Sequence, residues 1–284
     1  MGTRIPYYLG RVFRIPPSLS ERTSLLKWPL GWKGVVVHGG GGVAFTDTHP
    51  LVQHLTERYC SRGVHSIELP SHGSCASDNL FSAKIAKDHF YSTISTVIDS
   101  KTIVVSYSVG GIFTSSVWRS LCLSQDINPV AIFIGCHPRL VTRWPLISMY
   151  WSTPFTYLSQ KDKWYQKKHC GDRGDGYQDY WKTTVKNTHD WLHPSSDIQA
   201  DYRDLEFLKS KGMSAQWIIG DKDSAFPITH FQKSIDNKEL VGGMERVMRI
   251  KSTHFNYFLK NWPHTQLAID NILLAYRNSE LEKS

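Results

Sequence analysis

Residues 102–111 read T-I-V-V-S-Y-S-V-G-G, an apolar strand pattern that passes through a small-residue turn into a helical pattern. A serine in a G-x-S-x-G turn between strand and helix is typical of a nucleophile elbow, where the turn excludes large side chains two positions away. Gly110 meets this requirement, and Ser106 stands where glycine is usual. The turn would place Ser108 at the carboxyl end of a strand, where open α/β sheets bind ligands, and beside a helix N-terminus, which favours negative charge. Ser108 is therefore a candidate nucleophile; the alternative is an ordinary Ser/Gly-rich turn.

Apolar runs of the same kind alternate with helical patterns over most of the chain. Nearly continuous apolar runs predict strands that are buried on both faces, as in a parallel sheet. Their alternation with helices predicts an α/β fold with a doubly wound, mostly parallel sheet. The expected strands are 34–37, 65–69, 102–106, 130–135, 215–220 and 246–250, and the expected helices are 50–62, 82–98, 111–123, 229–236 and 265–276.

Residues 137–200 interrupt this alternation. They contain no clear strand and many aromatic side chains, and long insertions in compact domains are usually functional. We interpret them as a helical, aromatic-rich cap that divides the core into 1–136 and 201–284; the alternative is a set of helices on the sheet edge. The residues expected to contact substrate are Tyr107, Trp144 and Trp151. The rings of the cap could equally form its own core.

A second motif lies at residues 35–42, V-V-V-H-G-G-G-G, where an apolar strand leads into four glycines. Glycines let the backbone approach a ligand closely and expose N–H groups. Acyl transfer requires such donors around the oxyanion, one from a loop of this kind and one from the residue after the nucleophile. The expected donors are Gly40, Gly41 and Val109. A phosphate-binding loop is the alternative, but neither G-K-[ST] nor a helix-opening G-x-G-x-x-G is present.

The order of these motifs resembles that of the α/β-hydrolase superfamily along most of the chain. Its members often carry H-G-G after an early strand, here at 38–40, followed by an acidic residue, a proline and H-G, here within E-L-P-S-H-G at 68–73. The elbow, a cap insertion, a late G-x-x-D and a final histidine come next. The family usually has Asp where Glu68 stands and Gly where Ser71 stands, and neither position is catalytic. The resemblance implies an α/β-hydrolase fold with a helical cap.

The resemblance also implies the partners of Ser108. The acid of the family is the fourth residue of the late glycine motif, here Asp223 in G-D-K-D at 220–223, with Asp221 as the alternative. His254 follows the last expected strand and would be the base. Both aspartates could instead be turn residues, because Asp favours turns. The chain order Ser, Asp, His is the order that α/β-hydrolases have.

These residues would make the protein a serine hydrolase acting through an acyl-enzyme. His254 would take the proton of Ser108, and Asp223 would orient the imidazole. We expect a small, apolar or aromatic substrate with a carboxylic ester, thioester, lactone or carbon–carbon bond, and no metal or cofactor. The alternatives are an acyltransferase on the same scaffold and a hydrolase-like protein that binds a ligand without catalysis.

Composition excludes several other classes. The net charge is +8, but Lys and Arg are spread along the 284 residues without zinc-finger or RNA-binding patterns, so we expect no nucleic-acid partner. The five cysteines form no C-x-x-C pair, which argues against a disulfide framework or a structural zinc site. No apolar run approaches the roughly 20 residues of a membrane span, and the N-terminus lacks a secretory pattern. We expect a cytoplasmic protein without stable membrane insertion, and its oligomeric state is left open.

Overall fold

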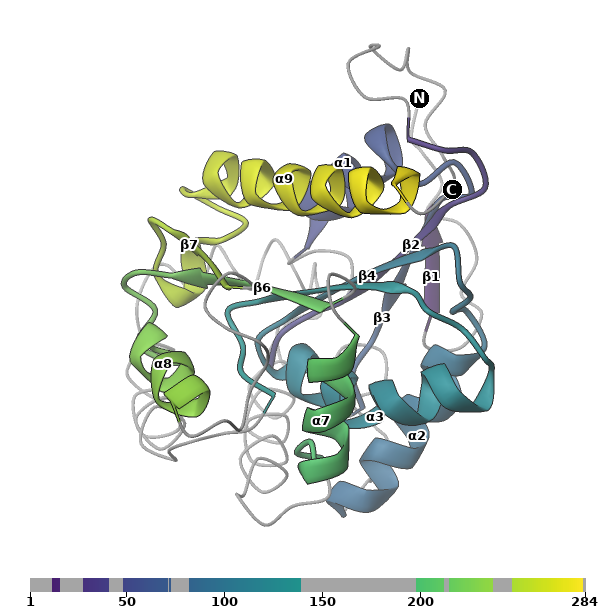
Figure 1. The fold of residues 1–284 in the computed structure, drawn as a ribbon, viewed down its shortest axis with the longest axis horizontal. Helices are drawn as coiled ribbons and strands as arrows, with labels where there is room; N and C mark the ends of the chain where they lie inside the picture. The colour runs from purple at the N-terminus through teal and green to yellow at the C-terminus, as the bar shows by residue number, and fades with distance from the viewer. Residues whose placement is uncertain are drawn as a thin grey trace, which may run out of the picture.

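The computed structural model describes residues 12–15, 28–40, 48–70, 72, 82–138, 198–211, 215–236 and 247–282. They form a seven-stranded sheet with the order β1-β3-β2-β4-β5-β6-β7 (Figure 1). Only β1 is antiparallel to its neighbour, β3, and every other pair is parallel. The strands are β1 (Val12–Ile15), β2 (Lys33–Val37), β3 (Val64–Ile67), β4 (Thr102–Tyr107), β5 (Val130–Ile134), β6 (Ala215–Gly220) and β7 (Val247–Ile250).

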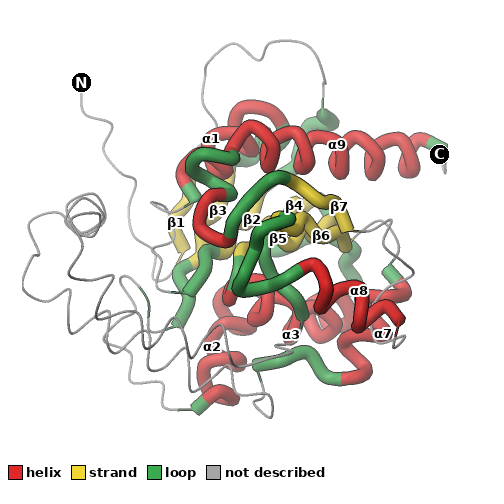
Figure 2. The backbone as a smooth tube through the Cα atoms, turned by 90° about the vertical axis from the view of Figure 1, so that its left-hand side faces the viewer, coloured by secondary structure: helices red, strands yellow, loops and turns green. Residues whose placement is uncertain are grey.

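Helices cover both faces of the sheet, as Figure 2 shows. One face carries α1 (His49–Arg58) and α9 (Trp262–Leu281). The opposite face carries α2 (Ala83–Ser95), α3 (Val109–Ser124), α7 (Tyr202–Ser210) and α8 (Ile228–Asp236). A short 3-10 helix, η4 (His254–Asn256), lies between β7 and α9. This layered arrangement is the one that strand–helix alternation predicts.

The sheet separates two hydrophobic cores. Because successive strand residues point to opposite faces, Val35 and Val37 of β2 pack in the core beneath α2, α3, α7 and α8, whereas Val36 packs beneath α1 and α9. The same alternation in β4 sends Val104 to one core and Val105 to the other. Burial on both faces explains why these strands are almost entirely apolar in sequence.

The strand order reverses direction between β2 and β4. The chain passes from β2 to β3 on one side and then crosses back to β4, which pairs with the other edge of β2. Val37 lies opposite Ser106 in this pair, so both strands end at the same edge of the sheet. The crevice at such a reversal is where open α/β sheets bind ligands. The glycine loop and the serine turn both start there.

The predicted fold class, an α/β fold with a doubly wound and mostly parallel sheet, is confirmed. All six expected strands and all five expected helices are present, with ends that shift by a few residues. Among the described residues, β1, α7 and the short η4 were not expected. The predicted cap at 137–200 lies outside the described residues except for 137–138 and 198–200.

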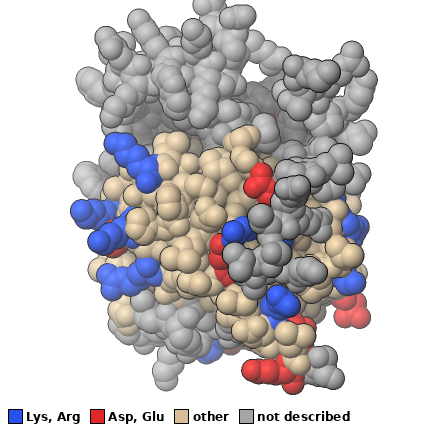
Figure 3. All heavy atoms as spheres, turned by 90° about the horizontal axis from the view of Figure 1, so that it is seen from above, with Lys and Arg blue, Asp and Glu red and all other residues tan. Residues whose placement is uncertain are grey.

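The surface of the described part carries mixed charge. In the view over α1 and α9, Lys and Arg side chains lie at separate places with Asp and Glu side chains among them (Figure 3). Among the described residues, no helix combines the length and the apolar composition that a membrane crossing needs.

Candidate active site

Ser108 occupies a sharp turn between β4 and α3. Its backbone has φ of 52° and ψ of −125°, a combination that is rare for a residue with a side chain. The Ser108 N–H donates to the carbonyl of Ile134 at 3.0 Å, and the Gly111 N–H donates to the Ser108 carbonyl at 2.9 Å. These two bonds hold the turn between β5 and the first turn of α3. The side chain therefore stands at the N-terminus of α3, at the carboxyl edge of the sheet.

The residues around Ser108 explain the small-residue pattern of the turn. A Cβ at Gly110 would lie 2.3 Å from the carbonyl oxygen of His38, which is backbone that cannot move aside easily. Ser106 stands in place of glycine, and its hydroxyl lies 2.9 Å from that of Thr114 inside the core. A buried hydroxyl with a hydrogen-bond partner carries little of the desolvation cost of an unpaired one.

The structure brings Ser108, His254 and Asp223 together. Ser108 Oγ lies 2.9 Å from His254 Nε2. His254 Nδ1 lies 3.1 Å from Asp223 Oδ1 and 3.0 Å from Asp223 Oδ2. Side chains from three separate parts of the sequence thus form one line of contacts, and all three are buried.

The two candidate acids occupy different environments. Asp223 Oδ1 accepts the backbone N–H groups of Ala225 and Phe226 at 2.9 and 2.8 Å, so its carboxylate is held inside its own turn and faces His254. Asp221 Oδ1 instead accepts the N–H of Ser252 at 3.1 Å and helps to join the ends of β6 and β7. The contact with His254 belongs to Asp223.

Aromatic rings fix the orientation of His254. The ring of Tyr107 lies against the imidazole, with centroids 5.4 Å apart and an angle of 26° between the planes, and the ring of Phe226 lies 5.5 Å away. The Tyr107 hydroxyl donates to the backbone carbonyl of His254 at 2.5 Å. Tyr107 was predicted to contact substrate. In the structure it contacts His254, and its role toward a substrate stays a prediction.

The glycine loop lies directly against Ser108. A Cβ at Gly39 would approach the Tyr107 ring to 2.9 Å and the Ser108 Cβ to 3.1 Å, so only glycine fits there. Gly40 follows in the described turn, and Val109 is the first residue of α3. The third predicted donor, Gly41, lies outside the described residues, as do Trp144 and Trp151.

The fully buried side chain of His38 anchors this loop. Its Nδ1 lies 2.7 Å from the carbonyl of Gly39, and the N–H of Leu69 donates to its Nε2 at 3.0 Å. Because the carbonyl oxygen of Gly39 can only accept, Nδ1 of His38 carries a proton and donates it to this carbonyl. His38 therefore joins the loop after β2 to the loop after β3. The sequence indicates only that a histidine precedes the glycines, because Leu69 is brought beside it by the sheet.

Glu68 and His72 complete a buried polar group around His38. Glu68 Oε1 lies 3.3 Å from His38 Nε2, and His72 Nδ1 lies 2.8 Å from the carbonyl of Pro70. Burial, together with the nearby His38, lowers the pKa of His72 to about 3. His72 is consequently neutral at physiological pH and serves to hold the loop after β3.

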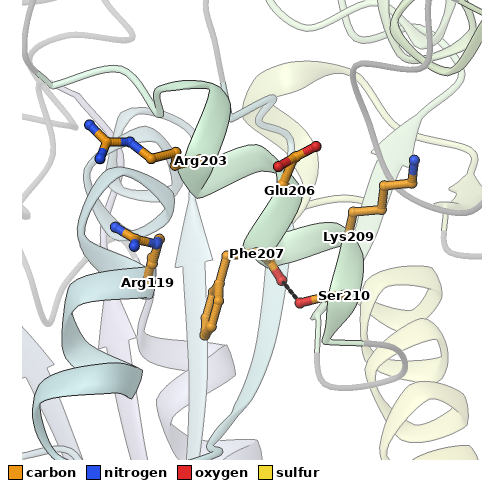
Figure 4. Close-up of a pocket in the computed structure, with 6 residues that line it drawn as sticks. All are labelled: Arg119, Arg203, Glu206, Phe207, Lys209 and Ser210. Carbon is orange, nitrogen blue, oxygen red and sulfur yellow. Dashed lines mark hydrogen bonds between the residues drawn. The ribbon is translucent and has the colours of Figure 1, made fainter.

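A hollow in the surface lies away from these residues. It is lined by one residue of α3, Arg119, and by five residues of α7, which are Arg203, Glu206, Phe207, Lys209 and Ser210 (Figure 4). Arg119 is about 16 Å from Ser108 along α3, at 1.5 Å per helical residue. Within the described ranges, no group of three or more His, Cys, Asp or Glu side chains could hold a metal ion.

Comparison with known families identifies the class. The model of the alpha/beta hydrolase family matches residues 35–258, which is most of the chain, and the protein belongs to this family. The resemblance predicted from the motifs is thus confirmed, and membership supports a hydrolase as the general function. No curated protein matches the sequence significantly.

Several solved structures share the fold at low sequence identity. A meta-cleavage product hydrolase from Pseudomonas fluorescens is 14% identical, with a TM-score of 0.58 over 87% of this chain and 92% of that one. A serine hydrolase involved in carbazole degradation is 14% identical, with a TM-score of 0.60 over 93% and 94%. A lipase-esterase related protein from Clostridium acetobutylicum is 12% identical, with a TM-score of 0.56 over 92% and 98%. At these identities the likeness concerns the fold.

Proposed function

We propose that this protein is a serine hydrolase that cleaves a carboxylic ester or a related acyl bond through an acyl-enzyme. The observation that carries the proposal is the line of contacts from Ser108 Oγ to His254 Nε2 and from His254 Nδ1 to Asp223. A nucleophile, a base and an orienting acid in hydrogen-bond reach of one another define this chemistry more firmly than fold alone.

The proposed first step is attack of Ser108 Oγ on the substrate carbonyl carbon while His254 Nε2 accepts the hydroxyl proton. Asp223 stays ionised and accepts a hydrogen bond from the Nδ1–H of His254, which selects the tautomer with a free Nε2 and stabilises the imidazolium. His254 then returns the proton to the leaving group. In the second half, water attacks the acyl-enzyme with His254 as base, and Ser108 leaves with the proton.

Backbone N–H groups are proposed to stabilise the oxyanion. Val109 opens α3 directly after Ser108, and Gly40 stands in the loop that packs against the nucleophile. Gly41 is a further candidate from the same loop. Preorganised donors of this kind are worth a factor on the order of 10²–10³ in kcat when one is removed.

The proposed substrate is a small, apolar or aromatic molecule covered by a cap formed by residues 137–200. Two observations support an insertion at this point. The segment departs just after β5, beside β4 and Ser108, and its ends meet again because the Ala200 N–H donates to the Pro138 carbonyl at 3.4 Å. Trp144 and Trp151 of that segment would contact the substrate.

The test is the hydrolysis of nitrophenyl esters of increasing acyl length by the wild-type protein and by Ser108→Ala. We expect the substitution to reduce turnover by on the order of 10³-fold or more, because only oxyanion and binding effects remain. Each methylene that fits an apolar pocket adds about 0.8 kcal/mol, so kcat/KM of the wild type should rise roughly fourfold per methylene until the pocket is full.

The circular dichroism spectrum of Ser108→Ala is the control that tests whether this variant is folded. A folded variant with wild-type turnover would refute Ser108 as the nucleophile. If the activity depends on Ser108 but does not change with acyl length, the protein is still a serine hydrolase, and the proposal of an apolar substrate is wrong.

A further inference from the structure

Tyr257 stands three residues after His254, at the end of the 3-10 turn η4. In a 3-10 turn, side chains three residues apart lie on the same side, so the turn that presents His254 also directs Tyr257 toward the same region. The Tyr257 side chain is fully buried. In the sequence, Tyr257 is one of 13 tyrosines. Its spacing of three residues from His254 was the only sequence feature that could have indicated a role at the site.

The hydroxyl of Tyr257 makes two hydrogen bonds in the core. It donates to Asp223 Oδ2 at 2.9 Å, and it accepts the backbone N–H of Gly220, the last residue of β6, at 2.5 Å. Burial and the charge of Asp223 raise the pKa of Tyr257 far above its ordinary value, so the hydroxyl keeps its proton and acts as a donor. Asp223 Oδ2 thereby receives a neutral donor in addition to His254.

Two glycines make the space for this ring. A Cβ at Gly135 would lie 2.6 Å from Tyr257 Cε2 and 3.2 Å from Asp223 Oδ2. A Cβ at Gly220 would lie 3.0 Å from the Tyr257 hydroxyl and 2.4 Å from the carbonyl of Ser252. The ends of β5 and β6 are thus shaped around a tyrosine whose hydroxyl reaches the acid.

We propose that Tyr257 is a positioning residue that fixes the Asp223 carboxylate and limits its basicity toward His254. The inference rests on the proposed function, in which Asp223 is the acid. Oδ1 is held by two backbone N–H groups, whereas Oδ2 depends on Tyr257 and His254. Without the hydroxyl, Oδ2 is held by His254 alone, and the carboxylate becomes both less fixed and more basic.

The other titratable side chains at this pair do not supply the same effect. Tyr107 lies against the imidazole of His254, and Cys136 is close enough to Asp223 for that charge to act on its thiol. Tyr107 donates its hydroxyl proton to the backbone carbonyl of His254 and not to the Asp223 carboxylate. Burial and the charge of Asp223 raise the pKa of the Cys136 thiol, which stays protonated. Tyr257 is therefore the side chain, besides His254, that donates to Asp223 in this part of the structure.

The test compares Tyr257→Phe with Tyr59→Phe. Tyr59 is a matched control, because its buried hydroxyl also donates to an aspartate, Asp270, at 2.5 Å, but within the contact between α1 and α9. Two quantities are measured in each variant. The first is the pH dependence of kcat and KM for a nitrophenyl ester. The second is the titration of the downfield proton resonance of His254 Nδ1, identified by its absence in His254→Ala.

For Tyr257→Phe we expect kcat to fall by roughly tenfold, the size of one hydrogen bond to a charged group, with KM within about twofold of wild type. A hydrogen bond to the charged form of a carboxylate lowers its basicity, so its loss should move the His254 titration upward by on the order of half a pH unit. Site-specific 3-fluorotyrosine at position 257, a stronger donor that keeps the ring, should move the titration downward. Tyr59→Phe should change neither quantity.

The inference is overturned if Tyr257→Phe and Tyr59→Phe have the same kcat and the same titration of His254. Tyr257 would then contribute to the packing of the core but not to the positioning of Asp223. The 3-fluorotyrosine protein gives the same decision if Tyr257→Phe does not fold. Failure of the proposed function has a different signature. In that case wild-type hydrolysis does not depend on Ser108, while the titration still reports whether Tyr257 acts on His254 through Asp223.

Discussion

Ser108 is held in a backbone conformation that it would not adopt in an unconstrained chain. A positive φ of this kind costs a non-glycine residue on the order of 1–3 kcal/mol. The hydrogen bonds to Ile134 and from Gly111 retain it, and Gly110 lets the first turn of α3 approach the loop after β2. The strain places a hydroxyl at a helix N-terminus and beside a glycine loop, which is where a nucleophile needs support for a developing negative charge.

The two aspartates after β6 give a matched pair of substitutions. Asp223→Asn should reduce kcat by on the order of 10⁴-fold, because a neutral amide neither selects the tautomer of His254 nor stabilises its charged form. Asp221→Asn keeps an oxygen that can accept the Ser252 N–H, so its activity should stay within about twofold of wild type. Steady-state kinetics of both variants on one activated ester makes the comparison.

The result that would contradict this assignment is a large loss in Asp221→Asn with a small one in Asp223→Asn. Thermal unfolding of both proteins serves as the control, because loss of the joint between β6 and β7 would lower stability without a specific effect on turnover.

The site residues differ in how far the sequence could predict them. Ser108 follows from a local pattern, and the contact between Asp223 and His254 was expected from the resemblance to α/β-hydrolases. The anchoring of the loop by His38 and the bond from Tyr257 to Asp223 depend on atoms that only the packed sheet brings together. A histidine before glycines and an aromatic residue after His254 occur in many different structures. The sequence pattern alone could therefore not predict the contacts of His38 and Tyr257.

Elements within the regular alternation of strands and helices were predicted, and two that lie outside it were not. The buried central strands stand out because both faces are apolar. β3 and β7 are as short as β1, but their apolar runs lie between helical patterns, whereas β1, with the sequence V-F-R-I, lies ahead of this alternation. α7 lies just after the proposed cap and is amphipathic over nine residues. Its start carries a capping box between Asp201 and Asp204, a signal that could have revealed it.

The ends of two helices differ from those that the apolar periodicity of the sequence predicted. The apolar pattern predicted a start at 111 for α3, but the helix begins at Val109, directly after the turn at Ser108. α9 was expected over 265–276 and extends over Trp262–Leu281, with a proline in its first turn. A proline there is compatible with a helix, since its missing N–H would have no partner within the helix.

Charged contacts also join elements that are far apart in the sequence. Asp99 makes several of these contacts at the amino ends of β2 and β4. Asp99 Oδ2 lies 2.8 Å from Lys33 Nζ and 2.9 Å from an Arg62 guanidinium nitrogen, and Oδ1 accepts the hydroxyl of Thr102. Burial by itself raises the pKa of Asp99, but these hydrogen bonds outweigh it and lower the pKa to about 2. One carboxylate thus joins β2, β4 and the turn after α1.

The sign of this shift gives a pH prediction. A carboxylate with a folded-state pKa of about 2 and an unfolded one of about 3.9 stabilises the fold above about pH 4, and the contribution is lost as the pH falls toward 2. Asp99→Asn should therefore lower the free energy of unfolding at pH 7 by roughly 1 kcal/mol, a value reduced by partial exposure, and should flatten the decline between pH 4 and 2. Urea unfolding over this range measures both effects.

Asp88→Asn is the control for this experiment, because Asp88 is exposed on α2. If Asp88→Asn and Asp99→Asn show the same dependence on pH, the acid sensitivity belongs to the net charge of the molecule and not to the contacts of Asp99.

The most direct measurement of the central claim is the intact mass of the protein after treatment with a fluorophosphonate, which phosphonylates an activated serine with loss of fluoride. The account predicts one adduct on the wild-type protein, located at Ser108 by peptide mapping, no adduct on Ser108→Ala, and strongly slowed labelling of His254→Ala because Ser108 loses its base. A folded wild-type protein that remains unlabelled, or one labelled to the same extent after Ser108→Ala, would contradict it.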